Sequence, residues 1–539
     1  MTTDVTIKID NTPLKQEAFG GGLEGAQRTS RETALWTPSF SSPDQIINTV
    51  KPMADARTQD MAQNDGYAAG AVNLHRDNIV GSQYRLIATP NRVVLDVDED
   101  YITEFQRVVE ARFNTVADSP ECWLDAARAN TFTGMIRLAV ATYVLTGETL
   151  ATAEWIREAR RPFKTAIQLI SPTRLSNPDG AMDTATLRRG KVIDAYGKAT
   201  AYWIQAAHPS EWYDPNAFFW KKIPAEKPWG RKMVMHHMER LMPAQNRGVS
   251  EMVAALKQMR MTKKFQEIVL QNAVVNASYA AAIESELPTA QVMELLGANT
   301  PGGGGVIDGM NEYIGSYMGA LASYLSGSKN IAIDGAKIPH LFPGTKLNMQ
   351  PLSTPGGVGT GFEESLIRHI AACLGLSYEE FSRDYTKTNY SSARASMNNT
   401  HKSMLSKKAF IADANARDWY ALWLEEDIAA GNIPLPPGKT RTWFYEPLVK
   451  DALTQCQFIG ASRGQIDELK ETEAGALRIE KHLSNHAIEN ARLGRDYREV
   501  FEQAAREKAL MKQLGIEAAD VQPARKRREN SEEEEQSER

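Results

Sequence analysis

The stretch SEMVAALKQMRMTKKFQEIVLQNAVVNASYAAAIESEL, residues 250–287, contains neither glycine nor proline. A helix along most of it would be roughly 50 Å long, at about 1.5 Å per residue. Helices of globular cores are usually shorter, about 10–14 residues. The first half carries large apolar residues and the second half carries alanines, which allow close approach of a neighbouring helix. Two interpretations stay open: a long core helix, or a strut that packs against copies of itself in a ring.

The chain that follows this stretch alternates between breaks and helices. Pro288 ends the helix, and glycines 302–305 mark an excursion. The spacing of apolar residues predicts a second helix over 310–325, followed by short strands or extended chain over 331–352. A second glycine-rich loop precedes a predicted helix over 362–374. Strong helical patterns also cover 390–430.

The chain before residue 250 reads as an arm followed by an α+β domain. Residues 1–60 are poor in core material, and the prolines and glycines among them predict irregular, mobile chain. From residue 61 helical spacing begins, and Gly81 ends the first run. Residues 143–156 predict a hairpin with its turn at Thr146-Gly147. The fold class predicted is α+β with helix predominating.

The C-terminal part predicts helices over about 450–516 and a charged tail over 517–539. The tail holds four glutamates at 532–535 and almost no apolar residues, which predicts disorder.

Composition argues against several classes. The 539 residues are 42% hydrophobic with a formal net charge of −5, which does not suit a protein whose main task is to grip phosphates. The three cysteines, Cys122, Cys373 and Cys456, are far apart, so no disulfide framework or zinc knuckle is predicted and a reducing compartment fits best. No apolar run approaches the roughly 18 residues of a membrane span, so we expect a soluble protein without a membrane partner.

No catalytic, cofactor or metal site is predicted. Residues 356–361 have the glycine spacing of a phosphate loop, but Phe362 and Glu363 stand where Lys and Ser or Thr are required. His482 and His486 could share a helix face, yet a metal needs a third ligand. His236 and His237 are adjacent, so in a strand they would point to opposite faces. A structural or interaction protein is therefore expected.

Several blocks of the sequence, in order, resemble the lambda family of tailed-phage portal proteins. They include NDGYAA (64–69), LHRDNIVGS (74–82), Arg247-Gly248, LGLSYE (374–379) and YSSARAS (390–396). The blocks extend from residue 64 to residue 426, with a weaker likeness in the arm and none in the charged tail.

The resemblance implies the portal fold, with wing, stem, clip and crown, assembled into a ring of usually twelve copies around a central channel. Its parts would be a flexible arm (1–60), the wing (61–249), the stem helix (250–284), the clip and second stem helix (285–350), the tunnel loop and channel helix (351–376), the helical wing return (377–449), the helical crown (450–516) and the disordered tail (517–539).

It also implies a function without chemistry. Double-stranded DNA would be packaged through the ring by the terminase motor and later ejected, and the ring would nucleate procapsid assembly at one vertex of the virion. Expected partners are other copies of the chain, the terminase large subunit, the major capsid and scaffolding proteins, a head-completion adaptor or tail, and DNA bound without sequence preference. Assembly would take place in the host cytoplasm, and the arm could be clipped afterwards.

The resemblance places a DNA-facing tunnel loop at Pro355, Gly356, Gly357, Val358, Gly359, Thr360 and Gly361. Candidates for weak phosphate contact are Lys346, Arg368 and Lys402, which could equally be ordinary surface charge. Two alternative functions stay open: a head–tail adaptor ring, although adaptors are normally much shorter, and a hydrolase with a nonstandard site.

Overall fold

The computed structural model describes residues 35–279, 331–333, 336–338, 358–386, 388–462, 464 and 467–515, together with the backbone at 315 and 319. The chain divides into two compact units. Unit 1 comprises 1–53, 173–224 and 239–248, and unit 2 comprises the remaining residues. The predicted second stem helix (310–325), the charged tail and most of the predicted clip lie outside the described residues.

Unit 1 is built on a four-stranded antiparallel sheet in the order β4-β5-β6-β7. The strands are β4 (Leu187–Arg188), β5 (Lys191–Ile193), β6 (Ala199–Gln205) and β7 (Trp220–Pro224). Buried Arg247 joins the segments of this unit, because its Nη1 donates to the carbonyl oxygens of Leu175 (2.7 Å) and Arg189 (3.0 Å). A guanidinium without such acceptors would be costly to bury.

Helix α1 (Pro43–Asn64) corrects the prediction of irregular chain up to residue 60. Ser42 Oγ accepts from the backbone N–H of Gln45 (3.4 Å), while Gln45 Oε1 accepts from the N–H of Ser42. This reciprocal arrangement is a capping box, and proline is well suited to the first helical position. Pro43, one of the prolines that we interpreted as signs of irregular chain, is therefore the first residue of a helix.

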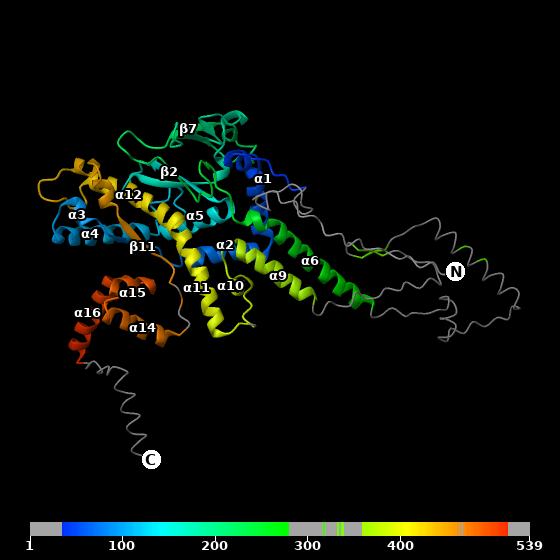
Figure 1. Ribbon diagram of the computed structural model, residues 1–539. Coiled ribbons are helices and arrows are strands. Elements are labelled where there is room, and N and C mark those ends of the chain that lie inside the picture. The colour runs from blue at the N-terminus through cyan, green and yellow to red at the C-terminus, as the bar shows by residue number, and fades with distance from the viewer. Residues whose placement is uncertain are drawn as a thin grey trace, which may run out of the picture. The chain divides into compact units, whose positions relative to one another are not determined.

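Unit 2 holds the main hydrophobic core, formed by helices around two small sheets (Figure 1). One sheet has the order β3-β2-β8 and the other pairs β1 with β11. The strands are β1 (Arg85–Ala88), β2 (Glu148–Trp155), β3 (Thr165–Ile170), β8 (Val234–Met238) and β11 (Cys456–Ile459). The helices are α2 (Gly66–Ile79), α3 (Arg92–Leu95), α4 (Glu99–Ala117), α5 (Phe132–Thr146), α6 (Met252–Tyr279), α9 (Val358–Cys373), α10 (Tyr378–Ser382), α11 (Tyr390–Lys407), α12 (Asp413–Ala430), α13 (Val449–Leu453), α14 (Glu468–Glu480), α15 (His486–Arg492) and α16 (Tyr497–Leu514).

The predicted hairpin over 143–156 is wrong in its first half. Residues 143–146 form the last turn of α5, and only β2 is a strand. Helix α5 is apolar on most of its surface because it is buried, so its pattern lacks the polar face that marks a surface helix. The Thr146-Gly147 turn is a helix C-terminus, where Gly147 adopts φ +77°.

Replacing Gly147 by alanine is expected to lower the free energy of unfolding by about 2–3 kcal/mol. An alanine there would have to adopt the left-handed backbone conformation, and its Cβ would overlap the backbone carbonyl group of Val249. Gly230→Ala is the matched control, because Gly230 has φ +84° with open space around its Cβ direction. Equal losses in urea unfolding of the two variants would contradict the close approach of Gly147 to Val249.

The C-terminal prediction of helices from residue 450 is also corrected. Strand β11 pairs antiparallel with β1, Arg85 opposite Ile459, so 456–459 belongs to the core of unit 2. Helix α13 does lie at the predicted start, and helical structure resumes at α14 after the strand. A four-residue edge strand carries too little alternation to be distinguished from helix by pattern.

Long helix formation over 390–430 is confirmed, with one interruption. Helices α11 and α12 are joined by the π-helical turn η5 (Lys408–Ala412). Such turns insert an extra residue into a helix and are often found at functional positions. The aromatic side chains of α12 lie in the core: Trp419, Tyr420 and Trp423 are fully buried.

Candidate functional site

Helix α9 has two distinct faces. Ile367, Ile370 and Ala371 are buried against the rest of unit 2. The opposite face is exposed and carries small and polar side chains at helical spacing: Ser365, Arg368, His369 and Ala372. From Ser365 to Ala372 this face carries no large apolar group, which suits contact with water or a hydrated polymer rather than a tight protein interface.

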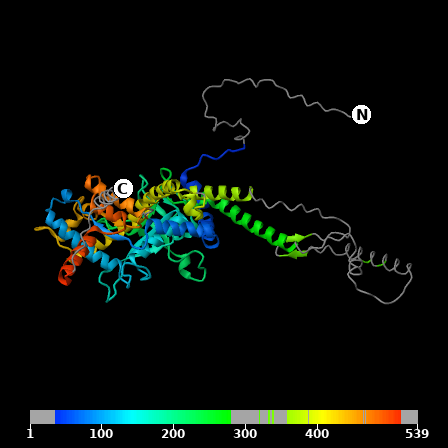
Figure 2. The ribbon, with the colours of Figure 1, turned by 90° about the horizontal axis from the view of Figure 1, so that it is seen from below.

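Helices α6 and α9 lie side by side and extend together from the body of unit 2 (Figures 1 and 2). The rings of Phe265 and Phe362 meet edge to face with centroids 5.9 Å apart. Gln266 Nε2 donates to Glu363 Oε1 at 2.6 Å. These contacts join two segments about a hundred residues apart in sequence. The sequence pattern of neither segment indicates that the other is its neighbour.

Arg368 lies on the exposed face of α9 and has nearby partners. Its Nη2 is 3.1 Å from Glu364 Oε2, one helical turn earlier, and its guanidinium lies 4.9 Å from the ring centroid of Tyr378. Exposed pairs of this kind are weak, so the guanidinium can exchange Glu364 for another anion. The position favours transient rather than fixed contact with phosphate.

The other predicted site residues are only partly visible. Residues 355–357 and Lys346 lie outside the described residues. Residues 358–361 form the first turn of α9, so the helix begins four residues earlier than the predicted 362. Lys402 is exposed on α11, a different helix from the one that carries Arg368. The structure thus leaves the DNA-facing role of these residues a prediction.

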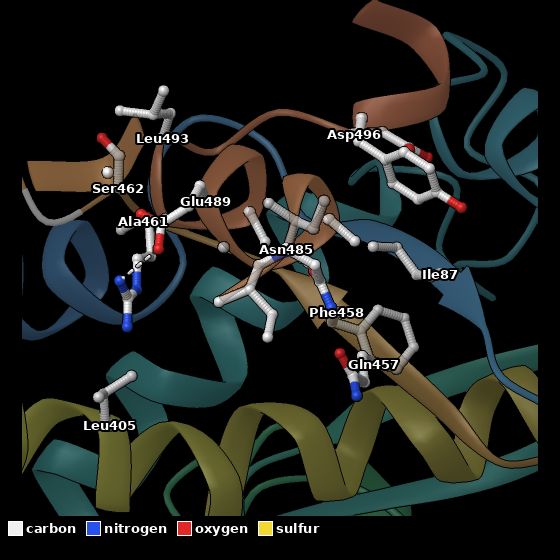
Figure 3. A pocket seen from close by; sticks show the side chains of 18 of the residues that line it. Ile87, Leu405, Gln457, Phe458, Ala461, Ser462, Asn485, Glu489, Leu493 and Asp496 are labelled. Atoms are coloured by element: carbon white, nitrogen blue, oxygen red, sulfur yellow. Dashed lines mark hydrogen bonds and ion pairs between the residues drawn. The ribbon is translucent and has the colours of Figure 1, made fainter. Parts of the chain in front are cut away.

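A cleft of about 1550 Å³ separates α14 and α15 from α11 and β11 (Figure 3). Apolar groups such as Leu405, Phe458 and Leu493 line it beside charged groups. The charged groups bond to one another: Arg478 Nη2 donates to Glu489 Oε2 at 2.9 Å. This guanidinium holds the pKa of Glu489 at about 2, so the carboxylate stays ionised and paired rather than available for proton transfer.

The predicted histidine pair forms no joint site, and among the described residues a cysteine–histidine contact joins Cys373 Sγ to His369 Nδ1 at 3.8 Å on α9. His482 follows α14 with φ +57°, while His486 opens α15 and meets the Phe501 ring at 5.3 Å, so the two do not share a helix face. Burial raises the pKa of the Cys456 thiol to about 12. Among the described residues no group of three or more metal-ligating side chains is placed to hold an ion, and no helix is long and apolar enough to span a bilayer.

His236 and His237 confirm the expectation for neighbours in a strand. Both lie on β8, and they reach different partners. His236 Nε2 is 2.9 Å from Glu148 Oε2 on β2, whereas His237 Nε2 is 3.1 Å from Asp418 Oδ2 on α12. These contacts connect β8 to two elements of the core and have a structural role.

Comparison with known proteins identifies the family. The family model for phage portal proteins of the lambda family matches residues 29–406. The portal protein of Escherichia phage N15 is 37% identical over 500 residues, covering 92% of this chain and 90% of the relative. Portal protein B of Escherichia phage lambda is 36% identical over 498 residues, with the same coverage. The chain belongs to the lambda family of phage portal proteins.

Membership in this portal family confirms the resemblance and the expected function of a portal protein. The family is structural, so the hydrolase alternative is excluded, and the match over 92% of the chain excludes a short head–tail adaptor. Among solved structures, a chain from the neck of an empty GTA particle matches with a TM-score of 0.35 at 12% identity, covering 86% of this chain and 97% of that chain. A chain from the neck of a native GTA particle matches with a TM-score of 0.33 at 11% identity, covering 81% and 95%.

Two features of the site left little sign in the sequence of this portal protein. The pairing of α6 with α9 depends on contacts over long sequence separation, which periodicity does not record. A lysine of α11, Lys407, is buried among three acceptors, although lysine is ordinarily an exposed residue. Only an alignment of co-varying positions could have indicated either contact.

Proposed function

We propose that the chain is one subunit of a closed ring, of twelve copies, whose channel conducts double-stranded DNA into and out of the capsid. Family membership carries the portal role, and the uncovered apolar surface of α6 supports the ring. Between residues 263 and 271 this helix buries little within the subunit: Ile268 is 49% exposed, Val269 45% and Leu270 66%. A helix with this much exposed apolar surface requires a partner, and a neighbouring copy supplies one by symmetry.

The exposed face of α9 would line the channel in this proposal. Its small and polar side chains offer DNA little to adhere to, and Arg368 would give weak, exchangeable phosphate contact. Each chain carries a formal charge of −5, so twelve copies carry about −60, a field that discourages DNA from binding the wall during sliding. Residues 355–361 would form the adjoining DNA-facing segment, with Lys346 and Lys402 as further weak contacts.

The remaining partners follow from the same role. The segment 285–350 would dock the terminase large subunit during packaging and a head-completion adaptor or tail afterwards. The wing, residues 61–249, would meet the major capsid and scaffolding proteins. The ring would assemble in the host cytoplasm and reside at one vertex of the virion, and the helices α14–α16 would form its crown.

The oligomeric state of the purified chain tests the ring. We expect native mass spectrometry to give a mass near twelve subunits and negative-stain images to show a central hole. A compact small oligomer without a channel would overturn the proposal.

Ile268→Asp is expected to abolish the ring and leave monomers or small oligomers, because twelve carboxylates would be forced into an apolar interface. Far-ultraviolet circular dichroism should be unchanged, since the side chain is half exposed in the subunit. Ile268→Val is the control and should retain ring mass. Full ring assembly by the aspartate variant would show that this face of α6 is not the subunit interface.

A further inference from the structure

The side chain of Lys407 contacts both helices of the candidate site where they join the rest of unit 2. Glu251 directly precedes α6, and Leu374 directly follows α9. Lys407 Nζ donates to Glu251 Oε2 at 2.6 Å and to the Leu374 carbonyl oxygen at 3.0 Å. The beginning of one helix and the end of the other are thus bonded to the same ammonium group.

The third contact of this ammonium group ties both helix ends to α2. Lys407 Nζ lies 3.1 Å from His75 Nε2, and His75 Nδ1 lies 2.7 Å from the Ala71 carbonyl oxygen. Because a carbonyl only accepts, Nδ1 carries the proton and Nε2 is the acceptor for Lys407. Burial, with the neighbouring ammonium, lowers the pKa of His75 to about 4, so the ring is a neutral acceptor at physiological pH.

The arrangement uses the full bonding capacity of lysine. An ammonium has three donors, and here each has an acceptor on a different element while the side chain is 8% exposed. Two of the three interactions also have the favourable sign for a helix dipole, since a carboxylate lies at the start of α6 and a cation lies at the end of α9. Full satisfaction of a buried charge fixes geometry, because any displacement would leave a donor unpaired.

The surrounding chain leaves little room for another solution. Gly375 follows Leu374 with φ +68°, and a Cβ there would overlap Ser403 Oγ and lie 3.5 Å from Lys407 Nζ. The π-helical turn η5 begins immediately after Lys407. The next side chain, Lys408, reaches Asp413 Oδ1 at 2.7 Å and the Phe458 carbonyl oxygen instead. Adjacent lysines of one helix therefore serve separate contacts.

We propose that Lys407 is a positioning residue. It holds the N-terminal end of α6 and the C-terminal end of α9 in place on unit 2, and it thereby sets the orientation of the exposed face of α9 in the channel. This inference rests on the proposed function, because α9 faces DNA only in an assembled ring. A force that acts on α6 and α9 would be transmitted to the rest of unit 2 through the contacts of this side chain. Lys407→Met keeps a side chain of similar length and removes all three donors.

The test compares full-length rings of the wild type, Lys407→Met and Lys508→Met by hydrogen exchange, and the DNA content of capsids assembled with each. Lys508→Met is the matched control, because Lys508 is an exposed lysine on α16 and is not one of the proposed DNA contacts. For Lys407→Met we expect amide exchange at residues 252–262 and 366–376 to accelerate roughly tenfold to a hundredfold, with α5 unchanged. Ring mass should be retained, and packaged DNA should fall at least roughly tenfold.

Exchange and packaging equal to those of Lys508→Met would overturn the proposal, as would loss of protection spread evenly over unit 2. If Lys407→Met does not fold, Glu251→Ala serves in its place, because it removes a single acceptor at a partly exposed side chain. It should accelerate amide exchange first at residues 252–262, the N-terminal part of α6. Absence of rings in the wild type would instead count against the proposed function. Amide exchange at residues 252–262 and 366–376 would still test whether Lys407 positions the two helices.

Discussion

Replacing Phe113 by alanine is expected to lower the free energy of unfolding of unit 2 by about 3–5 kcal/mol. The Phe113 ring on α4 is fully buried, and it meets Phe132, Tyr420 and Trp423 edge to face with centroids 5.2, 5.5 and 5.2 Å away. Removing it leaves a cavity between three helices that are already held by one another, so the site cannot collapse to fill it.

Urea unfolding followed by tryptophan fluorescence measures this loss, since Trp423 lies in the same cluster. Phe410→Ala is the matched control, because the Phe410 side chain on η5 is 54% exposed. It should change the free energy of unfolding by no more than about 0.5 kcal/mol. A similarly small change for Phe113→Ala would mean that α4, α5 and α12 do not meet at this point.

Glu110→Gln is expected to stabilise the protein relative to the wild type increasingly as the pH rises from about 5 to about 8. Glu110 Oε1 accepts from the Ala88 N–H at 2.9 Å, and Oε2 lies 3.3 Å from Arg498 Nη1 on α16. Burial raises the pKa of this carboxyl from 4.5 to about 7, although Arg498 opposes the shift. The folded state therefore holds a proton that the unfolded chain releases near pH 4.5.

The sign of the pH dependence follows from linkage. The stabilising contribution of the raised pKa is complete below pH 4.5 and is lost as the pH rises through about 7. At about 1.36 kcal/mol per pKa unit, the loss amounts to about 3 kcal/mol. Glutamine has no charge to bury, so its advantage over the wild type should grow by that amount. Glu99→Gln, with a side chain 68% exposed, is the control and should follow the wild-type profile. A constant difference between Glu110→Gln and wild type from pH 5 to pH 8 would contradict the burial of this carboxyl.

The long helices could be predicted because their patterns extend over many residues. Residues 252–279 and 390–407 form helices as expected, since neither segment contains a break and apolar residues recur at helical spacing. Local signals with two meanings caused the errors. Ser42-Pro43 is both a turn signal and a helix start, and Thr146-Gly147 is both a hairpin turn and a helix end. Which meaning applies depends on burial, which a local pattern does not contain.

The candidate site was predicted less completely than the fold. Arg368 was one of three candidates for weak phosphate contact. The structure places it on the exposed face of α9, and its contact with DNA stays a prediction. The α6–α9 pair and the Lys407 junction join segments that lie far apart in the sequence. Such contacts arise from the packing of whole helices, so no residue pattern within either segment predicts them.

Electron cryomicroscopy of the assembled particle tests the proposed ring directly, because it shows which face of α9 lines the channel. We expect a closed ring of twelve subunits with Ser365, Arg368 and His369 facing the lumen and with α6 against the neighbouring subunit. A ring in which α9 lies on the outer surface, or an assembly without a channel wide enough for double-stranded DNA, would contradict it.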